Sequence, residues 1–218
     1  MKKRLYAVLT VSVLLAIAAC GDSTTGPSAA GEWFPATVGN WWFTSMEGYW
    51  TDTQGDTTST WTGSFDNRIT AVVQHAGGFS VYERRAYGTM TNITPDSTWT
   101  TVDTLYHYFQ QTDEELRCYD DLTTTEYRIF AKFPITLNET WSHNDSSGTV
   151  LEVISLSETV NVSAGTFTDC ALVRETVTLG SSEWITDHYY HRGTGNVKNI
   201  MTTDGMYGTI ELQNYNVQ

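Results

Sequence analysis

The chain has 218 residues, a formal net charge of −13 and a mean hydropathy of −0.30. A surface this acidic repels nucleic acid and anionic lipid headgroups, so the composition excludes a nucleic-acid-binding function. Residues 1–19 contain three of the 12 basic residues and none of the 25 acidic ones, so their removal would leave a charge of −16. About 199 residues would then remain, which suits one domain.

The N-terminus has the three parts of an export signal. Lys2, Lys3 and Arg4 precede an apolar stretch, and small residues come directly before Cys20. The apolar stretch, residues 5–19, is shorter than the roughly 20 residues that a transmembrane helix needs. An ordinary secretory signal would explain the small residues but gives no reason for the cysteine.

The segment Ile17-Ala18-Ala19-Cys20 resembles the lipobox of bacterial lipoproteins. The resemblance implies cleavage before Cys20, a diacylglyceryl group on its thiol and acylation of the new amine. Gly21 is not the aspartate that retains many lipoproteins in the inner membrane, so the resemblance implies the outer membrane, with either leaflet open. We expect a signal peptide at 1–19, the lipidated cysteine and a flexible linker at 20–31, and a single domain at 32–218.

The sequence from Trp41 onward is typical of strands. Apolar and polar residues alternate, as in Ile69-x-Ala71-x-Val73, and this period of two indicates strands that are buried on one face. Turn-forming pairs such as Gly77-Gly78 and Asp204-Gly205 separate these stretches. The pattern predicts an all-β fold in which a single antiparallel meander of about ten strands curls into an open or closed barrel. A β-sandwich is the alternative.

One short sequence occurs twice. Residues 34–42 and 133–141 both read Phe-Pro-x-Thr followed by an aliphatic residue, with a Trp eight positions after the Phe. Proline is excluded from interior ladder positions, so each copy is expected to turn the chain into a new strand. The Trp that ends each copy, Trp42 or Trp141, would anchor that strand in the core.

Three segments resemble uncharacterised secreted β-rich bacterial lipoproteins. Residues 34–42 are similar to their Phe-Pro-x-x-x-Gly-Asn-x-Trp opening. Residues 160–170 are similar to a Val-x-Val-Pro-Ala-Gly-Thr-Phe-x-x-Cys segment, with Ser163 in place of the proline. Residues 189–198 are similar to Tyr-Tyr-x-x-Gly-x-Gly-x-Val-Lys, with Asn196 in place of an aliphatic residue. The resemblance implies one curled antiparallel β domain. The chain also resembles, more distantly, the open barrels of lipoprotein and lipid carriers. Neither implies an activity.

Two cysteines remain once Cys20 carries lipid. Cys118 and Cys170 are an even pair in an oxidising compartment, which favours a disulfide between them. The alternative is two separately buried thiols. Neither belongs to a Cys-x-x-Cys pattern, which argues against redox catalysis and against a thiolate metal site.

The polar motifs do not form a catalytic, cofactor-binding or metal site. His188 and His191 would point to opposite faces of a strand, so they could not share one ion. Gly193-x-Gly195 lacks the third glycine and the following helix of a dinucleotide site, and a glycine turn or bulge explains it better. The acidic residues at 113–115 and 120–121 and Glu152 are expected to be solvated.

The eight tryptophans are many for a domain of this size. Large side chains alternate onto both faces of residues 41–50, so we expect that strand to be covered on both sides. Most of the tryptophans are expected in the core, and the rest could line a groove for lipid or a platform for sugar.

The sequence therefore predicts an outer-membrane-anchored lipoprotein that is not an enzyme and needs no cofactor. We expect it to act as a carrier or scaffold for an apolar ligand or an envelope protein. A carbohydrate- or surface-binding module and an unrecognised hydrolase are the alternatives, and the oligomeric state is left open.

Overall fold

The computed structural model describes residues 32–143, 148–180 and 182–218. The expected signal peptide, Cys20 and the linker at 20–31 lie outside the described residues. In the part that is described, we find no helix with the length and apolar character needed to span a membrane.

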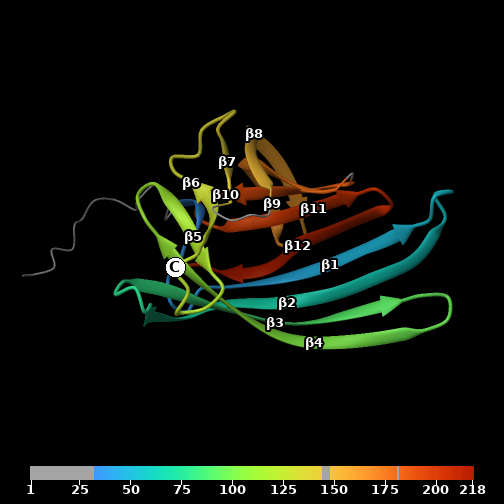
Figure 1. Ribbon diagram of the computed structural model, residues 1–218, viewed down its shortest axis with the longest axis horizontal. Helices are drawn as coiled ribbons and strands as arrows, with labels where there is room; N and C mark the ends of the chain where they lie inside the picture. The colour runs from blue at the N-terminus through green and yellow to red at the C-terminus, as the bar shows by residue number, and fades with distance from the viewer. Residues whose placement is uncertain (1–31, 144–147, 181) are drawn as a thin grey trace, which may run out of the picture.

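Twelve strands follow one another along the chain (Figure 1). The first six are β1 (Trp41–Thr51), β2 (Thr57–Gln74), β3 (Ser80–Ile93), β4 (Thr98–Gln111), β5 (Glu115–Tyr119) and β6 (Arg128–Lys132). The last six are β7 (Thr140–Ser142), β8 (Thr149–Val162), β9 (Gly165–Leu179), β10 (Ser182–His191), β11 (Gly195–Thr203) and β12 (Met206–Asn216).

All twelve strands belong to one antiparallel sheet. Its order is β6-β5-β4-β3-β2-β1-β12-β11-β10-β9-β8-β7, so the chain runs out to one edge, crosses to the other edge and returns to pair β12 with β1. The predicted all-β meander is confirmed, with twelve strands instead of about ten. The strands β5 and β7 are only five and three residues long, which is too short for a clear period of two.

The sheet curls until its two edges meet, which makes a nearly closed barrel. The edge strands β6 and β7 are joined by side chains: Trp141 Nε1 donates a hydrogen bond to the carbonyl oxygen of Ile129 at 3.1 Å. His143 Nδ1 lies 3.0 Å from the same oxygen. These contacts reduce the exposure of two edges that would otherwise be open to pairing with other chains.

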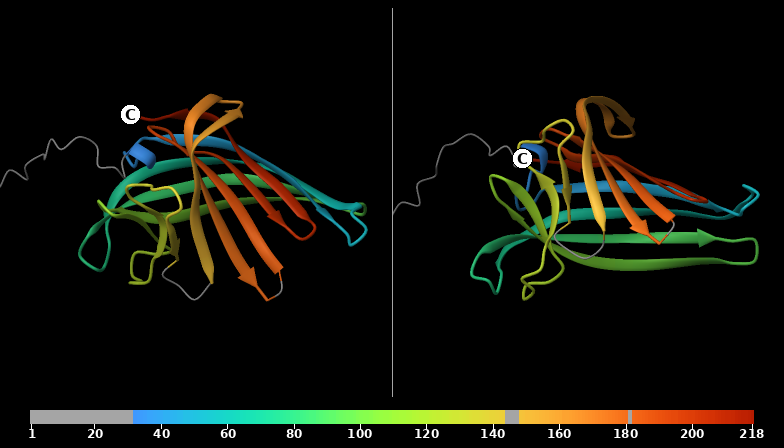
Figure 2. Two further views of the ribbon diagram at one scale, coloured as in Figure 1. Left: turned by 90° about the horizontal axis from the view of Figure 1, so that it is seen from above. Right: turned by 45° about the horizontal axis from the view of Figure 1, so that its top comes forward.

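The start of the described chain closes one end of the barrel. Trp33 is buried in a cluster with Phe109, Leu116 and Phe133 from the opposite wall. Glu32 anchors this segment, because its carboxylate pairs with Arg192 and its carbonyl accepts a hydrogen bond in the β10–β11 turn. The segment lies beside the C-terminus at the same end of the barrel (Figure 2).

Glycines on the inner face make room for an indole. A β-carbon on Gly48 or Gly208 would lie 2.2 or 2.3 Å from Cζ2 of Trp61, so the ring of this buried tryptophan lies directly over both residues. Such covering of a strand glycine by an aromatic ring stabilises a curved sheet.

The aromatic residues of β1 correct one expectation. The strand is not covered on both sides, because Phe43 and Tyr49 on the outer face are 39% and 41% exposed, and all the described strands belong to one sheet. Half of the tryptophans are buried, namely Trp33, Trp42, Trp61 and Trp141. Trp50, Trp99 and Trp184 are exposed. Trp42 and Trp141 are the two residues predicted as strand anchors, and this prediction is confirmed.

The cysteines correct another expectation. Cys118 and Cys170 are unbonded, so the disulfide favoured from the sequence is not formed in this structure. The physical reason is their placement: Cys118 on β5 packs in the cluster around Phe109, whereas Cys170 on β9 packs in the cluster around Leu212. Burial raises the pKa of each thiol to about 11, which keeps both in the unreactive protonated form.

Candidate functional site

The interior of the barrel contains a cavity of about 300 Å³. This lies at the small end of the range of about 300–1,000 Å³ that is typical of small-molecule sites. Both halves of the chain contribute to its lining. The apolar part of the lining includes Trp42, Phe65, Leu105, Phe109, Phe130 and Ile210. The polar part includes Asn67, Arg84, His107, His188, Tyr190 and Asn199.

The cavity is closed at one end and reaches solvent elsewhere. Trp33 and Phe34 form part of its wall at the end that the N-terminal segment closes, and the ring of Phe34 lies 5.0 Å from that of Phe109. Leu105 on β4 also lines the cavity, and it is 49% exposed. A ligand could therefore enter past β4 without unfolding the closed end.

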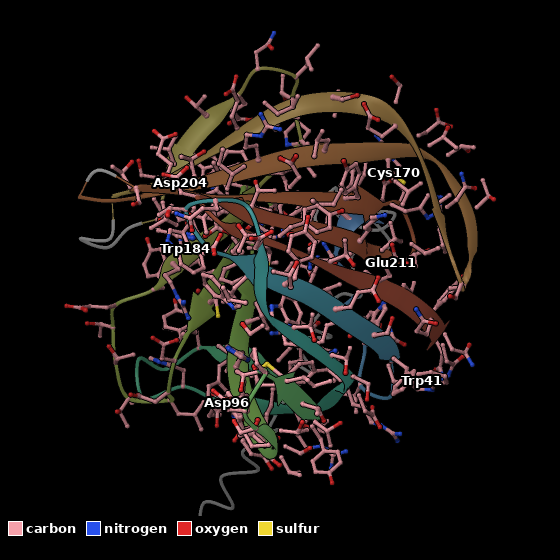
Figure 3. All side chains as sticks on the ribbon, turned by 90° about the vertical axis from the view of Figure 1, so that its right-hand side faces the viewer. Trp41, Asp96, Cys170, Trp184, Asp204 and Glu211 are labelled. Carbon is pink, nitrogen blue, oxygen red and sulfur yellow. The ribbon has the colours of Figure 1, made fainter. Side chains whose placement is uncertain are left out.

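The opposite end of the barrel carries an exposed aromatic pair. The rings of Trp50 on β1 and Trp184 on β10 lie 6.0 Å apart in an edge-on arrangement. Their strands are separated in the sheet by β12 and β11, so this contact spans the inner face. Figure 3 looks onto this end, where Trp184 lies near the turn that carries Asp204.

Arg84 is the cation of the cavity. It lies on β3 beside Ala86, on the face of the strand that turns toward the interior. Its guanidinium carbon lies 5.0 Å from the centre of the Phe109 ring, and its Nη2 donates to Nδ1 of His107 at 3.3 Å. Its Nε is buried and has no hydrogen-bond partner among the described residues.

The ionisable neighbours of Arg84 are neutral at neutral pH. Burial and the charges of Arg84 and Arg128 lower the pKa of His107 to about 4, so its imidazole accepts a proton only in acid. Burial raises the pKa of the Cys118 thiol to about 11 and raises that of the Tyr190 phenol as well. None of these groups supplies a negative charge to the guanidinium.

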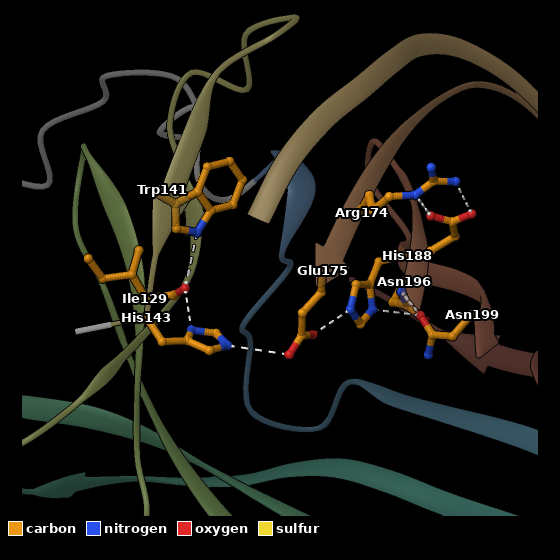
Figure 4. A network of polar contacts seen from close by, with 9 residues as sticks. Ile129, Trp141, His143, Arg174, Glu175, His188, Asn196 and Asn199 are labelled. Carbon is orange, nitrogen blue, oxygen red and sulfur yellow. Dashed lines mark hydrogen bonds and ion pairs between the residues drawn. The ribbon is translucent and has the colours of Figure 1, made fainter. Parts of the chain in front are cut away.

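A second polar group centres on Glu175 of β9 (Figure 4). Its carboxylate lies 2.9 Å from Nε2 of His188 and 3.6 Å from Nε2 of His143. His188 Nδ1 lies 2.9 Å from the side-chain oxygen of Asn199 on β11. Since His143 also contacts Ile129, this chain of contacts runs from β6 across the seam to β11.

The two histidines hold Glu175 in its charged form. Burial alone would raise the pKa of this carboxyl, but hydrogen bonds from His143 and His188 and their charges outweigh it and lower the pKa to about 2. Each imidazole directs one nitrogen to the carboxylate and the other to a protein oxygen. Among the residues the structure describes, no group of three or more His, Cys, Asp and Glu side chains is arranged to hold a metal ion.

The structure separates the histidines of the His188-x-x-His191 motif. His188 faces the cavity and contacts Glu175, whereas His191 contacts the hydroxyl of Thr194 at 3.0 Å and packs against Phe167. The expectation that the two imidazoles point in different directions is confirmed. Gly193 belongs to the turn between β10 and β11 and has a φ of 74°, so the glycine-turn interpretation is confirmed as well.

The acidic residues singled out from the sequence serve local contacts. Glu115 pairs with Arg117, and Asp120 pairs with Arg128. Asp121 accepts hydrogen bonds from the hydroxyl of Thr123 and from the backbone of Thr123 and Thr124, which lower its pKa. These three carboxylates therefore serve ion pairs and a turn, and the cavity lining does not include them.

Apart from His188, the sequence did not identify the charged and titratable residues of the interior. Arg84, His107, His143 and Glu175 come from distant parts of the chain and belong to no motif. One signal was available: in Tyr82-Glu83-Arg84-Arg85-Ala86, the period of two places Arg84 on the same face as Tyr82 and Ala86. An arginine on the apolar face of a strand indicates an interior cation.

Comparisons with known proteins give little for this chain. No family model and no curated protein matches it. One solved structure that is similar to this chain is that of an inferred exported protein with a YmcC-like fold from Bacteroides fragilis. The two share 12% identity with a TM-score of 0.43, and the match covers 84% of this chain and 98% of that one. Another is of an inferred lipoprotein from Parabacteroides distasonis, at 14% identity and a TM-score of 0.41, covering 84% and 97%. At values this low, neither protein informs the function of this chain.

Proposed function

We propose that this protein is an exported, lipid-anchored lipoprotein that binds and carries an apolar ligand inside its barrel, without catalysis. The observation that carries the proposal is the cavity of about 300 Å³, whose wall is formed mainly by aromatic and aliphatic side chains with a few polar groups. Preformed apolar cavities with few polar groups are the usual sites for small ligands.

Native mass spectrometry tests the carrier function. The twelve strands and the cavity lie entirely within residues 33–216, so the chain from Gly31 onward, exported without its anchor and purified without detergent, contains the whole barrel. We expect an added mass in the native spectrum that disappears on denaturation. A spectrum of the bare chain alone would contradict the proposal and favour a glycan- or protein-binding surface.

A pair of alanine variants shows whether the ligand occupies the cavity. Ala86→Leu adds bulk to the cavity wall, whereas Ala76→Leu makes the same change at an exposed position between β2 and β3. The added mass should be absent or reduced in Ala86→Leu and kept in Ala76→Leu. Equal ligand content in both variants would place the ligand elsewhere.

The anchor part of the proposal concerns Cys20, and the lipobox resemblance supports it. A single acyl chain holds a protein only marginally, so the multiple acylation that the resemblance implies would be needed for a lasting anchor. Cys20→Ser should move the full chain from the membrane fraction to the soluble fraction. If the variant stayed with the outer membrane, the anchor would have to lie elsewhere.

A further inference from the structure

We infer that the cavity takes a single-chain carboxylate amphiphile, whose carboxylate binds the guanidinium of Arg84 and whose alkyl chain lies along the aromatic wall. This inference rests on the proposed carrier function and names the class of ligand. Two features of the cavity carry it: the unpaired cation and the apolar surface that adjoins it.

Arg84 has donors to spare. A guanidinium carries five N–H donors in a planar fork that matches a carboxylate. The contact with His107 uses one of them, and Nε is buried without a partner among the described residues. A buried donor without a partner is unfavourable, and more so where the group is charged, so a bound group that accepts its hydrogen bond would remove that cost.

The described part of the chain supplies no anion to this cation. Five other arginines form ion pairs with carboxylates, namely Arg68, Arg117, Arg128, Arg174 and Arg192. None of the ion pairs among the described residues includes Arg84 or Arg85, and the Nε of each is buried without a partner. Of these two arginines, only Arg84 lines the cavity. Glu175 on β9 is a partly buried carboxylate, and it already contacts the imidazoles of His143 and His188.

The free energy of a partly buried cation without a counter-ion favours an external one. Burial lowers the pKa of Arg84, which is the signature of a charge that has given up its water without gaining a full partner. A bound carboxylate would replace that hydration with two parallel hydrogen bonds.

The surroundings of Arg84 select the rest of the ligand. Phe109 lies under the guanidinium, and Phe65, Leu105 and Phe130 continue the apolar wall. An alkyl chain attached to the carboxylate would bury its surface there. The net charge of the chain is strongly negative, which disfavours a highly charged head group and favours a single negative charge.

Calorimetric titration with sodium decanoate and with decan-1-ol tests the inference. The two probes share the alkyl chain and differ in the charge of the head group. We expect decanoate to bind the chain from Gly31 onward about tenfold or more tightly than decanol, since a hydrogen bond to a charged group contributes about 1.5–3 kcal/mol and each 1.4 kcal/mol is tenfold.

Two adjacent arginines provide matched variants. Arg84→Met should remove the preference for decanoate over decanol, because the substitution removes the positive charge and keeps an apolar side chain of similar length. Arg85→Met removes the same charge from the next residue of β3, which points to the opposite face and does not line the cavity. It should keep the preference.

The outcomes separate this inference from the proposed function. Equal affinity of the wild-type protein for decanoate and decanol would overturn the carboxylate inference and leave the apolar carrier intact. No binding of either probe would contradict both. The wild-type comparison decides the inference even if Arg84→Met does not fold. A preference that survives in a folded Arg84→Met protein would assign the anion to another cation.

Discussion

Ile69 on β2 and Val153 on β8 form the same pair of backbone hydrogen bonds in the two halves of the barrel. The carbonyl of Ile69 accepts from Gly39, and its N–H donates to Asn40. The carbonyl of Val153 accepts from Asn138, and its N–H donates to Glu139. The two Phe-Pro-x-Thr segments therefore make equivalent turns, and each turn docks on the second strand of its own half.

The equivalent turn positions make a prediction about Gly39 and Asn138. Both have a left-handed backbone, with φ of 98° and 64°. Nothing lies within 4 Å of a β-carbon built on Gly39, so Gly39→Ala should cost only the backbone strain, about 1–2 kcal/mol of unfolding free energy. Asn138→Ala should also destabilise, whereas Asn138→Gly should be close to neutral. Urea unfolding measures all three, and a stable Gly39→Ala would show that the turn relaxes.

The seam between β6 and β7 predicts a selective effect of tryptophan substitution. Trp141→Phe removes the indole N–H and leaves the carbonyl of Ile129 with one partner fewer, besides reducing the volume of a buried side chain. We expect the unfolding free energy to fall by about 1–3 kcal/mol. Trp99→Phe is the matched control, since Trp99 is 47% exposed, and it should change stability by less than about 0.5 kcal/mol. Equal effects would show that the seam contact contributes nothing.

The physical reach of sequence patterns explains what was predicted and what was not. The period of two, the turn residues and the repeated Phe-Pro-x-Thr segment are all local, so they predicted the meander and the core positions of Trp42 and Trp141. Whether both faces of β1 are buried depends on whether a second layer covers Phe43 and Tyr49, and a local sequence pattern contains no information on this. Likewise, the distance between Cys118 and Cys170 and the meeting of His143 with Glu175 follow from the curl of the sheet.

Arg84 also shows that a local sequence pattern predicts the face on which a side chain lies but not its partners. The alternation of apolar and polar residues in β3 is sufficient to place Arg84 on the inner face. Whether Arg84 has a carboxylate partner depends on how β9, β10 and the β6–β7 seam are arranged around it. Glu175 could have served as its counter-ion, and the structure instead gives that carboxylate to His143 and His188. Only the three-dimensional arrangement distinguishes a neutralised arginine from a free one.

The buried thiols predict the chemistry of Cys118 and Cys170. With the pKa of each thiol at about 11, the thiolate fraction at pH 8 is small, and burial blocks access. We expect the native chain from Gly31 onward to react very slowly with a thiol reagent such as Ellman's reagent. The denatured chain, without added reductant, should react with an amount of reagent that corresponds to two free thiols per molecule. If the denatured protein had no free thiols, the result would support a disulfide between Cys118 and Cys170.

The Glu175 network predicts how stability depends on acid. The folded-state pKa of Glu175 is about 2, below its ordinary value of 4.5, so the unfolded chain takes up the proton first as pH falls. The stabilisation is therefore complete above pH 4.5 and disappears as pH falls from about 4.5 to 2, by about 3 kcal/mol at most. Glu175→Gln should be less stable than the wild type at pH 7, and the difference should shrink across this window. Glu47→Gln, at an exposed position of β1, should show no such convergence. A difference between wild type and Glu175→Gln that stays constant from pH 7 to pH 2 would mean that the imidazoles do not hold this carboxylate in its charged form.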